Sequence, residues 1–405
     1  MVRNNKKQRI ALVVPGLANG REGGVPSVAE FLFHVLSNSE RYHPHVISLA
    51  TSNKDQNSVR ILSPSSWLRG VQTTSFSWKG IPALHVGANF TELEFQRYRP
   101  RRLLINLLNE YDLVQIISGS PAPGILSKEL SPPVVIQVAT LAAVERETML
   151  KRQYFLKRVW SNMMTRITNR LDHEALKSVD HVFVENDWMY RYCEDNLVPH
   201  RVTLAPPGID TRVFKPSSIF PDNGFILSVG RFSDPRKNVA LLFRAYHALS
   251  SLISNPPPLV LAGGSMPGPG DWRIARDLGI ADRVELFEGV STTELAKLYR
   301  QARLFVLSSN EEGLGIVLLE AMASAVPVVA TRCGGPEGVL TDGKTGFLVP
   351  VADFQALAEK MVTLLQNTEL SHRLGQNGRN LILARYSEEA AGRAFLNVYD
   401  GLVEI

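Results

Sequence analysis

Residues 310–320 read NEEGLGIVLLE: an acidic loop, two glycines and then an apolar run that predicts the first turns of a helix. Glycine lets an anionic group approach the backbone closely, and the N–H groups at a helix N-terminus attract anions. Glu312 and Glu320 have seven residues between them, a separation of roughly 12 Å if the stretch is helical. Carboxylates at that distance can bind the hydroxyls of a hexose and of a ribose. The stretch therefore fits one nucleotide sugar, with the diphosphate in between.

A cationic turn lies earlier in the chain, in SVGRFSDPRKN at residues 228–238, just after an apolar run at 225–229 that predicts a strand. Of its cationic residues, Arg231 and Lys237 are the candidates for binding a diphosphate. A departing nucleoside diphosphate gains negative charge, so fixed cations stabilise the transition state more than the ground state. They can replace a metal ion, and no DxD-like acidic pair occurs where a divalent cation would be expected. The alternative is a solvated surface pair, which the position after a strand disfavours.

Residues 312–330 resemble the Glu-x7-Glu signature of the family four retaining glycosyltransferases, and residues 228–238 are similar to the Gly-Arg and Lys-Asn segment of that family. The resemblance implies the α/β GT-B fold, in which two doubly wound Rossmann-like domains face each other across a cleft. It also implies that Glu312 contacts the donor sugar and Glu320 the ribose, and that Glu312, Arg231 and Lys237 are the catalytic residues. The implied donor-binding set is Gly23, Gly24, Gly230, Arg231, Lys237, Gly264, Phe287, Glu312, Gly313, Leu314, Gly315, Ile316, Val317 and Glu320.

Other segments carry weaker signals. Residues 263–265 (GGS) and 283–289 (RVELFEG) resemble the family's base-binding edge, although Phe287 fits a plain core position equally well. Residues 333–338 (CGGPEG) resemble its glycine turn, and residues 23–28 (GGVPSV) its glycine loop facing the donor phosphates. A paired glycine before a helix is common, so only the other matches make this last segment informative.

One segment departs from the family. After the predicted strand at 134–138 many relatives carry a His that contacts the sugar or shapes the acceptor pocket, whereas this chain continues with Ala139 and Thr140. Gln137, Thr140 and Glu145 are the acceptor-side candidates that could substitute in part.

The chain has 405 residues, 44% of them apolar and 20% charged, which is typical of a globular enzyme with two cores rather than one. Apolar runs that predict parallel strands alternate with helix-compatible stretches. These runs lie at residues 10–14, 113–117, 134–138, 181–184, 225–229, 259–262, 284–287, 304–307 and 328–330. We expect an acceptor-side Rossmann-like domain at 1–210, a nucleotide-sugar-binding domain at 211–386, and a helix at 387–405 that crosses back as in relatives. A Pro-rich linker lies at 205–224.

The net charge of +5 comes from the N-terminal half. Basic residues gather at 97–102 and at 151–170, where they alternate with aromatic and apolar side chains. Such a segment fits a solvated helix face, an anionic lipid surface or phosphorylated acceptor, or a nucleic acid, for which no module signature is present. No apolar run reaches the length of a membrane span or a signal peptide. Cys193 and Cys333 form no metal or disulfide motif, which favours the cytoplasm.

We therefore expect a metal-independent, retaining enzyme that needs no cofactor. It would move a sugar, most simply from a UDP-sugar, to a hydroxyl of a saccharide or lipid-linked acceptor in glycan or cell-envelope polysaccharide synthesis. It would work in the cytoplasm, with peripheral contact to anionic membrane at the cytoplasmic face and no nucleic-acid partner. The alternatives are a nucleotide-sugar epimerase, a phosphorylase, or a catalytically silent protein that binds sugar nucleotides. A dehydrogenase is disfavoured because the opening loop lacks GxGxxG.

Overall fold

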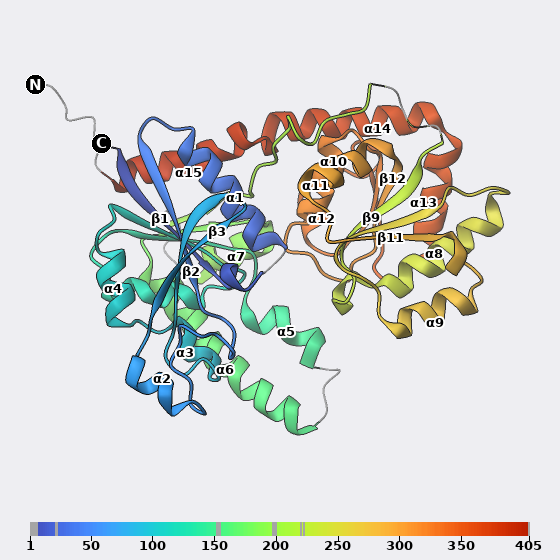
Figure 1. Ribbon diagram of the computed structural model, residues 1–405. Helices are drawn as coiled ribbons and strands as arrows, with labels where there is room; N and C mark the ends of the chain where they lie inside the picture. Colours follow the sequence, from blue (N-terminus) through green and yellow to red (C-terminus); the bar gives the residue numbers. More distant parts are fainter. Residues whose placement is uncertain are drawn as a thin grey trace, which may run out of the picture. The chain divides into compact units, whose positions relative to one another are not determined.

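The computed structural model describes residues 7–20, 23–150, 155–196, 201–218, 221 and 223–403. The chain divides into two compact units (Figure 1). Unit 1 comprises Met1–Pro207 together with Ala391–Ile405, and unit 2 comprises Gly208–Ala390. The boundaries expected from the sequence are at 210/211 and 386/387. In the described part of the chain, no helix is both long and apolar enough to span a membrane.

Unit 1 is built on an eight-stranded sheet of order β3-β4-β2-β1-β5-β6-β7-β8. The strands are β1 (Gln8–Pro15), β2 (Tyr42–Leu49), β3 (Thr73–Trp78), β4 (Ile81–Val86), β5 (Leu113–Ile117), β6 (Val134–Val138), β7 (His181–Val184) and β8 (Val202–Leu204). All neighbours pair in parallel except β3, which runs antiparallel to β4 at the edge. β5 and β6 are buried along their whole length, because helices cover both faces of the sheet.

The helices of unit 1 are η1 (Leu17–Asn19), α1 (Gly24–Ser37), α2 (Pro64–Arg69), α3 (Glu94–Tyr98), α4 (Arg102–Leu108), η2 (Ala122–Glu129), α5 (Ala142–Leu150), α6 (Phe155–Ser178), α7 (Asp187–Asn196) and α15 (Glu388–Leu402). α15 begins after Ser387, whose hydroxyl accepts a hydrogen bond from the N–H of Ala390 at 3.2 Å. Its Phe395 packs between Phe31 of α1 and Phe183 of β7, with ring centroids at 5.7 and 4.4 Å. The end of the chain thus completes the core of unit 1.

Unit 2 has a six-stranded, wholly parallel sheet of order β11-β10-β9-β12-β13-β14. The strands are β9 (Phe225–Arg231), β10 (Leu259–Ser265), β11 (Val284–Glu288), β12 (Ala302–Leu307), β13 (Val328–Thr331) and β14 (Phe347–Val349). The helices are η4 (Pro235–Lys237), α8 (Val239–Leu252), α9 (Pro269–Asp277), η5 (Ala281–Arg283), α10 (Thr292–Gln301), α11 (Ile316–Ala323), α12 (Gly335–Val339), α13 (Phe354–Gln366), α14 (Thr368–Leu381) and the π-helical η6 (Ile382–Tyr386).

Helices cover the two faces of this second sheet. One apolar core joins the strands to α10 and α11, and the other joins them to α8, α9 and α13. Figure 1 shows helices on both sides of this sheet. In an open parallel sheet, ligands bind beyond the carboxyl ends of the strands, where the strand order reverses. Here β9 lies between β10 and β12, so the loops after β9, β10 and β12 meet at such a point.

Candidate functional site

The turn after β9 carries the two cations predicted from the sequence. Asp234 caps η4 by accepting a hydrogen bond from the N–H of Arg236 at 3.0 Å. Asn238 adopts a left-handed conformation (φ 47°) and caps α8 with its side chain. The two caps fix the backbone on both sides of Lys237, so the turn presents this lysine in one orientation.

Lys237 and Glu312 meet although they lie far apart in the sequence. Lys237 Nζ is 2.5 Å from Glu312 Oε1, and the hydroxyl of Ser309 donates to the same oxygen at 2.6 Å. The side chains of Lys237 and Glu312 are only 15% and 11% exposed. Both donors meet Oε1, so Oε2 is the oxygen of Glu312 that can accept a hydrogen bond from a ligand.

The acidic loop is held in place by the chain that follows β13. The N–H of Glu312 donates to the carbonyl of Cys333 at 3.0 Å, and the N–H of Gly335 donates to the carbonyl of Glu312 at 2.9 Å. A Cβ at Gly335 would lie 2.6 Å from backbone atoms of Leu314, so only glycine fits this contact. Residues 333–338, the expected glycine turn, therefore hold the acidic loop in place through backbone hydrogen bonds.

The helix N-terminus expected after the two glycines is α11. Gly315 is its N-cap in a left-handed conformation (φ 84°). Ile316 and Val317 form the first turn, and Leu314 is buried beneath it. Gly313 lies in the preceding loop, so the N–H groups of residues 313–317 lie at the same end of the sheet as Glu312. This backbone can receive an anionic group.

Glu320 lies within α11 and is positioned by a tyrosine that sequence reasoning missed. The hydroxyl of Tyr299 in α10 is 2.9 Å from Glu320 Oε2 and 3.0 Å from the carbonyl of Val317. Burial and the nearby Glu320 carboxylate raise the pKa of Tyr299 well above its usual value. The phenol therefore stays protonated and acts as a donor. No sequence spacing connects these two residues, because the contact depends on how α10 and α11 pack.

Arg231 stands at the end of β9 with 44% of its side chain exposed, 3.5 Å from Asp234. Asp234 binds Arg236 more closely, at 2.8 Å. Burial alone would raise the pKa of Asp234, but its hydrogen bonds from Arg236 hold the pKa below the usual value. Asp234 is thus an anion that orients two arginines, and Arg231 keeps an accessible guanidinium. The sequence predicted no role for Asp234 or Arg236.

β10 and β11 form the other side of this sheet end. Gly263 has φ 149°, and a Cβ there would lie 2.1 Å from the carbonyl oxygen of Gly230, so β9 and β10 can approach this closely only with glycine. Gly264 follows and is exposed. Phe287 of β11 pairs with Ala262 and is 38% exposed. It is therefore not a plain core residue, the alternative that the sequence left open.

The candidates in unit 1 lie in three different environments. Gly23 is the N-cap of α1 with φ 109°, and Gly24 is the first residue of that helix. Gln137 is fully buried in β6 and donates to the carbonyl of Ala205 at 3.2 Å, so it does not face solvent. Thr140 and Glu145 are partly exposed, and the N–H of Thr140 donates to the carbonyl of Gly119 at 3.1 Å.

The remaining chemistry of the site is limited. The buried thiol of Cys333 has its pKa raised to about 12 by burial, so it is a neutral group and no nucleophile. Within the described residues, no group of three His, Cys, Asp or Glu side chains could hold a metal ion. What the sheet end of unit 2 offers is two cations, two carboxylates and a helix N-terminus, the requirements for binding a diphosphate between two hydroxyl-rich groups.

Comparison with known sequences points to the same unit. Residues 210–381 match the model of the family described as glycosyl transferases group 1. A D-inositol 3-phosphate glycosyltransferase 2 from Catenulispora acidiphila is 34% identical over 228 residues, which are 51% of this chain and 52% of the relative. A GDP-mannose-dependent alpha-(1-6)-phosphatidylinositol monomannoside mannosyltransferase from Mycolicibacterium smegmatis is 30% identical over 48% of this chain and 55% of its own. The chain spans about half the length of the curated relatives it matches.

Solved structures match nearly the whole chain. A sucrose-phosphate synthase from Thermosynechococcus elongatus has a TM-score of 0.72 at 22% identity, over 98% of this chain and 99% of its own. Anabaena HepE in complex with UDP and glucose has a TM-score of 0.70 at 17% identity, over 98% and 100%. At these identities the likeness shows the fold alone.

Proposed function

We propose that this chain, whose residues 210–381 match the family of glycosyl transferases group 1 and which has the GT-B fold of two Rossmann-like domains, transfers a sugar from a nucleoside diphosphate sugar to a hydroxyl group. The observation that carries the proposal is the pair formed by Lys237 and Glu312 at the sheet end of unit 2. It places a cation for the diphosphate beside a carboxylate for the sugar.

The donor binds along this sheet end. The diphosphate lies against the N–H groups of residues 313–317 and is neutralised by Lys237 and Arg231. Glu312 accepts hydrogen bonds from the sugar hydroxyls through Oε2, and Glu320, fixed by Tyr299, accepts them from the ribose. The base stacks beside Phe287, whose exposed ring supports this role. UDP is the proposed nucleotide, since the fold neighbour HepE has been solved with UDP and glucose. GDP is the main alternative, since GDP-mannose is in the name of one relative.

The proposed reaction retains the configuration and needs no metal ion. The acceptor oxygen forms a bond to the anomeric carbon on the face from which the phosphate oxygen leaves, and the acceptor proton passes to that phosphate oxygen. Lys237 and Arg231 stabilise the negative charge that builds on the diphosphate, which is the work a divalent cation would otherwise do. The proton has its acceptor on the leaving group, so no protein base is required.

The acceptor is proposed only by class, as a saccharide or a lipid-linked hydroxyl. Relatives include a glycosyltransferase named for D-inositol 3-phosphate and one named for a phosphatidylinositol monomannoside. Thr140 and Glu145 of unit 1 are the proposed acceptor-side residues, whereas the buried Gln137 can act only by shaping β6. The buried thiols of Cys193 and Cys333, which are not joined in a disulfide, support a cytoplasmic location.

The proposal is tested in two steps. Calorimetric titration with UDP, GDP and ADP identifies the nucleotide, and the corresponding sugar nucleotides are then compared. With the preferred donor, the transfer product is identified by NMR, whose anomeric coupling reports retention or inversion. The proposal fails if none of the three nucleotides binds at millimolar concentration. Conversion of the donor to another sugar nucleotide without any acceptor would establish the epimerase alternative instead.

A further inference from the structure

Unit 1 exposes large apolar side chains on a short segment that the proposed function does not use. In residues 61–69, here called the α2 segment, Leu62 and Leu68 are 89% and 94% exposed. The segment is anchored, because Trp67 Nε1 donates to the carbonyl of Arg60 at 2.7 Å and Ser66 is buried beneath it. The leucines are thus held outward by a fixed backbone.

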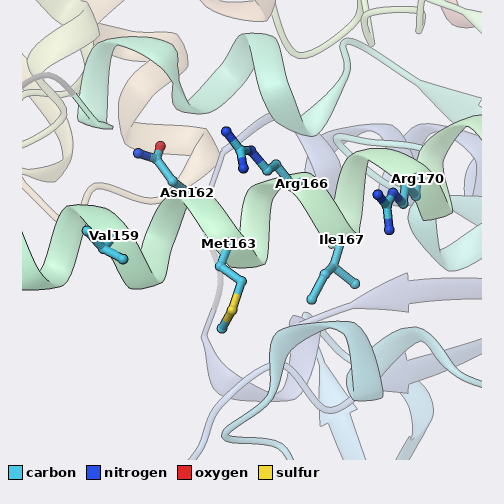
Figure 2. A pocket seen from close by; sticks show the side chains of 6 residues that line it. All are labelled: Val159, Asn162, Met163, Arg166, Ile167 and Arg170. Atoms are coloured by element: carbon cyan, nitrogen blue, oxygen red, sulfur yellow. The ribbon is translucent and has the colours of Figure 1, made fainter.

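The outer face of α6 has the same character. Val159, Trp160 and Met163 are each about half exposed, whereas the opposite face of the helix is buried against η2. A groove of about 410 Å³ runs along the exposed face. Its lining residues are Val159, Asn162, Met163, Arg166, Ile167 and Arg170. Figure 2 shows Met163 and Ile167 pointing to one side of the helix and Asn162 and Arg166 to the other.

Positive charge accompanies both apolar elements. Arg158, Arg166 and Arg170 are exposed on α6, and no acidic residue occurs between 155 and 171. Arg69 is exposed directly beside Leu68. The start of the basic segment, with Lys151, Arg152 and Tyr154, lies outside the described residues.

The two elements belong to one region of unit 1. The ring of Trp67 packs edge-on against Phe90 at 6.4 Å. Phe90 leads into α3, and α3 packs against α6. In Figure 1, α2, α3 and α6 accordingly gather at one end of unit 1. The carboxylate of Glu92 accepts a hydrogen bond from the N–H of Ile61 at 3.1 Å, so the excess of positive charge lies on α6. The α2 segment and the outer face of α6, together called the docking surface, therefore combine protruding apolar side chains with the exposed arginines of α6.

We propose that the docking surface binds an anionic phospholipid bilayer. Apolar side chains on an interfacial segment enter the boundary between headgroups and acyl chains, while flanking cations bind the headgroup phosphates. The two leucines protrude almost completely, which suits a soft lipid phase. A protein partner would require a complementary pocket for each of them. The proposal is independent of donor chemistry, because the docking surface includes none of the residues assigned to the nucleotide.

The test is co-sedimentation of the full chain with extruded vesicles of phosphatidylcholine alone or mixed equally with phosphatidylglycerol. We expect binding to the mixed vesicles that weakens as salt rises, and little binding to phosphatidylcholine. Arg166→Glu with Arg170→Glu should lower the partition coefficient by about tenfold or more, since each cation near an anionic surface contributes about 1 kcal/mol. Leu62→Ser with Leu68→Ser should lower it to a similar extent in high salt.

The matched control is Arg273→Glu with Arg276→Glu, a pair of exposed arginines on α9 of unit 2. This control changes the net charge of the chain as much as the α6 variant does, but it should bind vesicles nearly as tightly as the wild type. All variants should keep the wild-type unfolding temperature and UDP affinity, so a failure of the docking surface is distinguishable from a failure of the donor site. Equal loss in the control and α6 variants would overturn the proposal. So would a dimer in light scattering that Leu62→Ser with Leu68→Ser dissolves, because the leucines would then join two copies.

Discussion

Replacing Lys237 by methionine separates the structural from the functional role of its contact with Glu312. At 2.5 Å and an effective dielectric constant of about 20, the Coulomb attraction of the two charges is about 7 kcal/mol before desolvation is subtracted. Removing one partner of a fully buried pair costs about 3–5 kcal/mol. Because both side chains keep some exposure, we expect Lys237→Met to lower the free energy of unfolding by about 3 kcal/mol.

The double variant Lys237→Met with Glu312→Gln removes both charges and should recover the free energy of unfolding to within about 1 kcal/mol of the wild type. UDP binding should not recover. A hydrogen bond to a charged group contributes about 1.5–3 kcal/mol, so loss of the lysine should weaken UDP binding by about 10- to 100-fold in both lysine variants. Glu312→Gln alone should leave UDP affinity unchanged or stronger, since it frees Lys237.

The assays are urea unfolding and calorimetric titration with UDP. Arg332→Met is the control, because Arg332 and Asp342 form an ion pair in unit 2 whose side chains are both 44% exposed. It should change stability by less than about 1 kcal/mol and UDP affinity not at all. If the double variant binds UDP as tightly as the wild type, Lys237 serves only to neutralise Glu312 and its assigned role in diphosphate binding is refuted.

Three further predictions concern other positions. Phe287→Ala should weaken UDP binding by about tenfold with little loss of stability. Leu286→Ala, at the adjacent exposed position, should leave UDP affinity unchanged. Equal UDP affinities of the two variants would show that the base does not bind at β11. Gly263→Ala should destabilise unit 2 by about 3 kcal/mol or more, because its Cβ would lie 2.1 Å from the carbonyl oxygen of Gly230. Gly279→Ala, at a position with φ 66° and open space, should lower the free energy of unfolding by only about 1 kcal/mol. Similar losses for the two variants in thermal unfolding would refute the close contact. Burial raises the pKa of Asp172 to about 7, although hydrogen bonds from the N–H groups of Ala142 and Ala122 act in the opposite direction and lower it. Its contribution to stability is therefore complete below about pH 4 and lost as the pH rises to about 7, by up to about 4 kcal/mol. Unfolding of the wild type and Asp172→Asn at both pH values should show a difference that shrinks as the pH rises, and a constant difference would contradict this.

The sequence predicted the elements whose apolar runs are buried on both faces. β5, β6, β9, β10 and β12 all lie where Val- and Ile-rich runs had placed strands. The sequence missed β2, β3, β4 and β8 of the first sheet. β2 is an inner strand, but it begins with YHPH, so its apolar run is interrupted although most of its residues are buried. β3 and β4 read TTSFSW and IPALHV, and their partial exposure removes the continuous apolar signal.

The candidate site was predictable wherever the chemistry is local in the sequence. The cationic turn and the acidic loop could be identified because each lies directly after a predicted strand. Their pairing through Lys237 and Glu312, and the support of Glu320 by Tyr299, depend on contacts between elements distant in the chain. Ser309 could have been found, since it precedes Glu312 by three residues in the same loop. The exposure of Phe287 could not be predicted, because β11 lies at the edge of its sheet and the order of the strands is not visible in the sequence.

A crystal structure of the chain with the nucleoside diphosphate sugar selected by titration tests the central claim most directly. We predict hydrogen-bond distances from Lys237 Nζ to a diphosphate oxygen, from Glu312 to a hexose hydroxyl and from Glu320 to the ribose. A sugar nucleotide bound elsewhere, with Lys237 and Glu312 still joined only to each other at saturating ligand, would contradict the account.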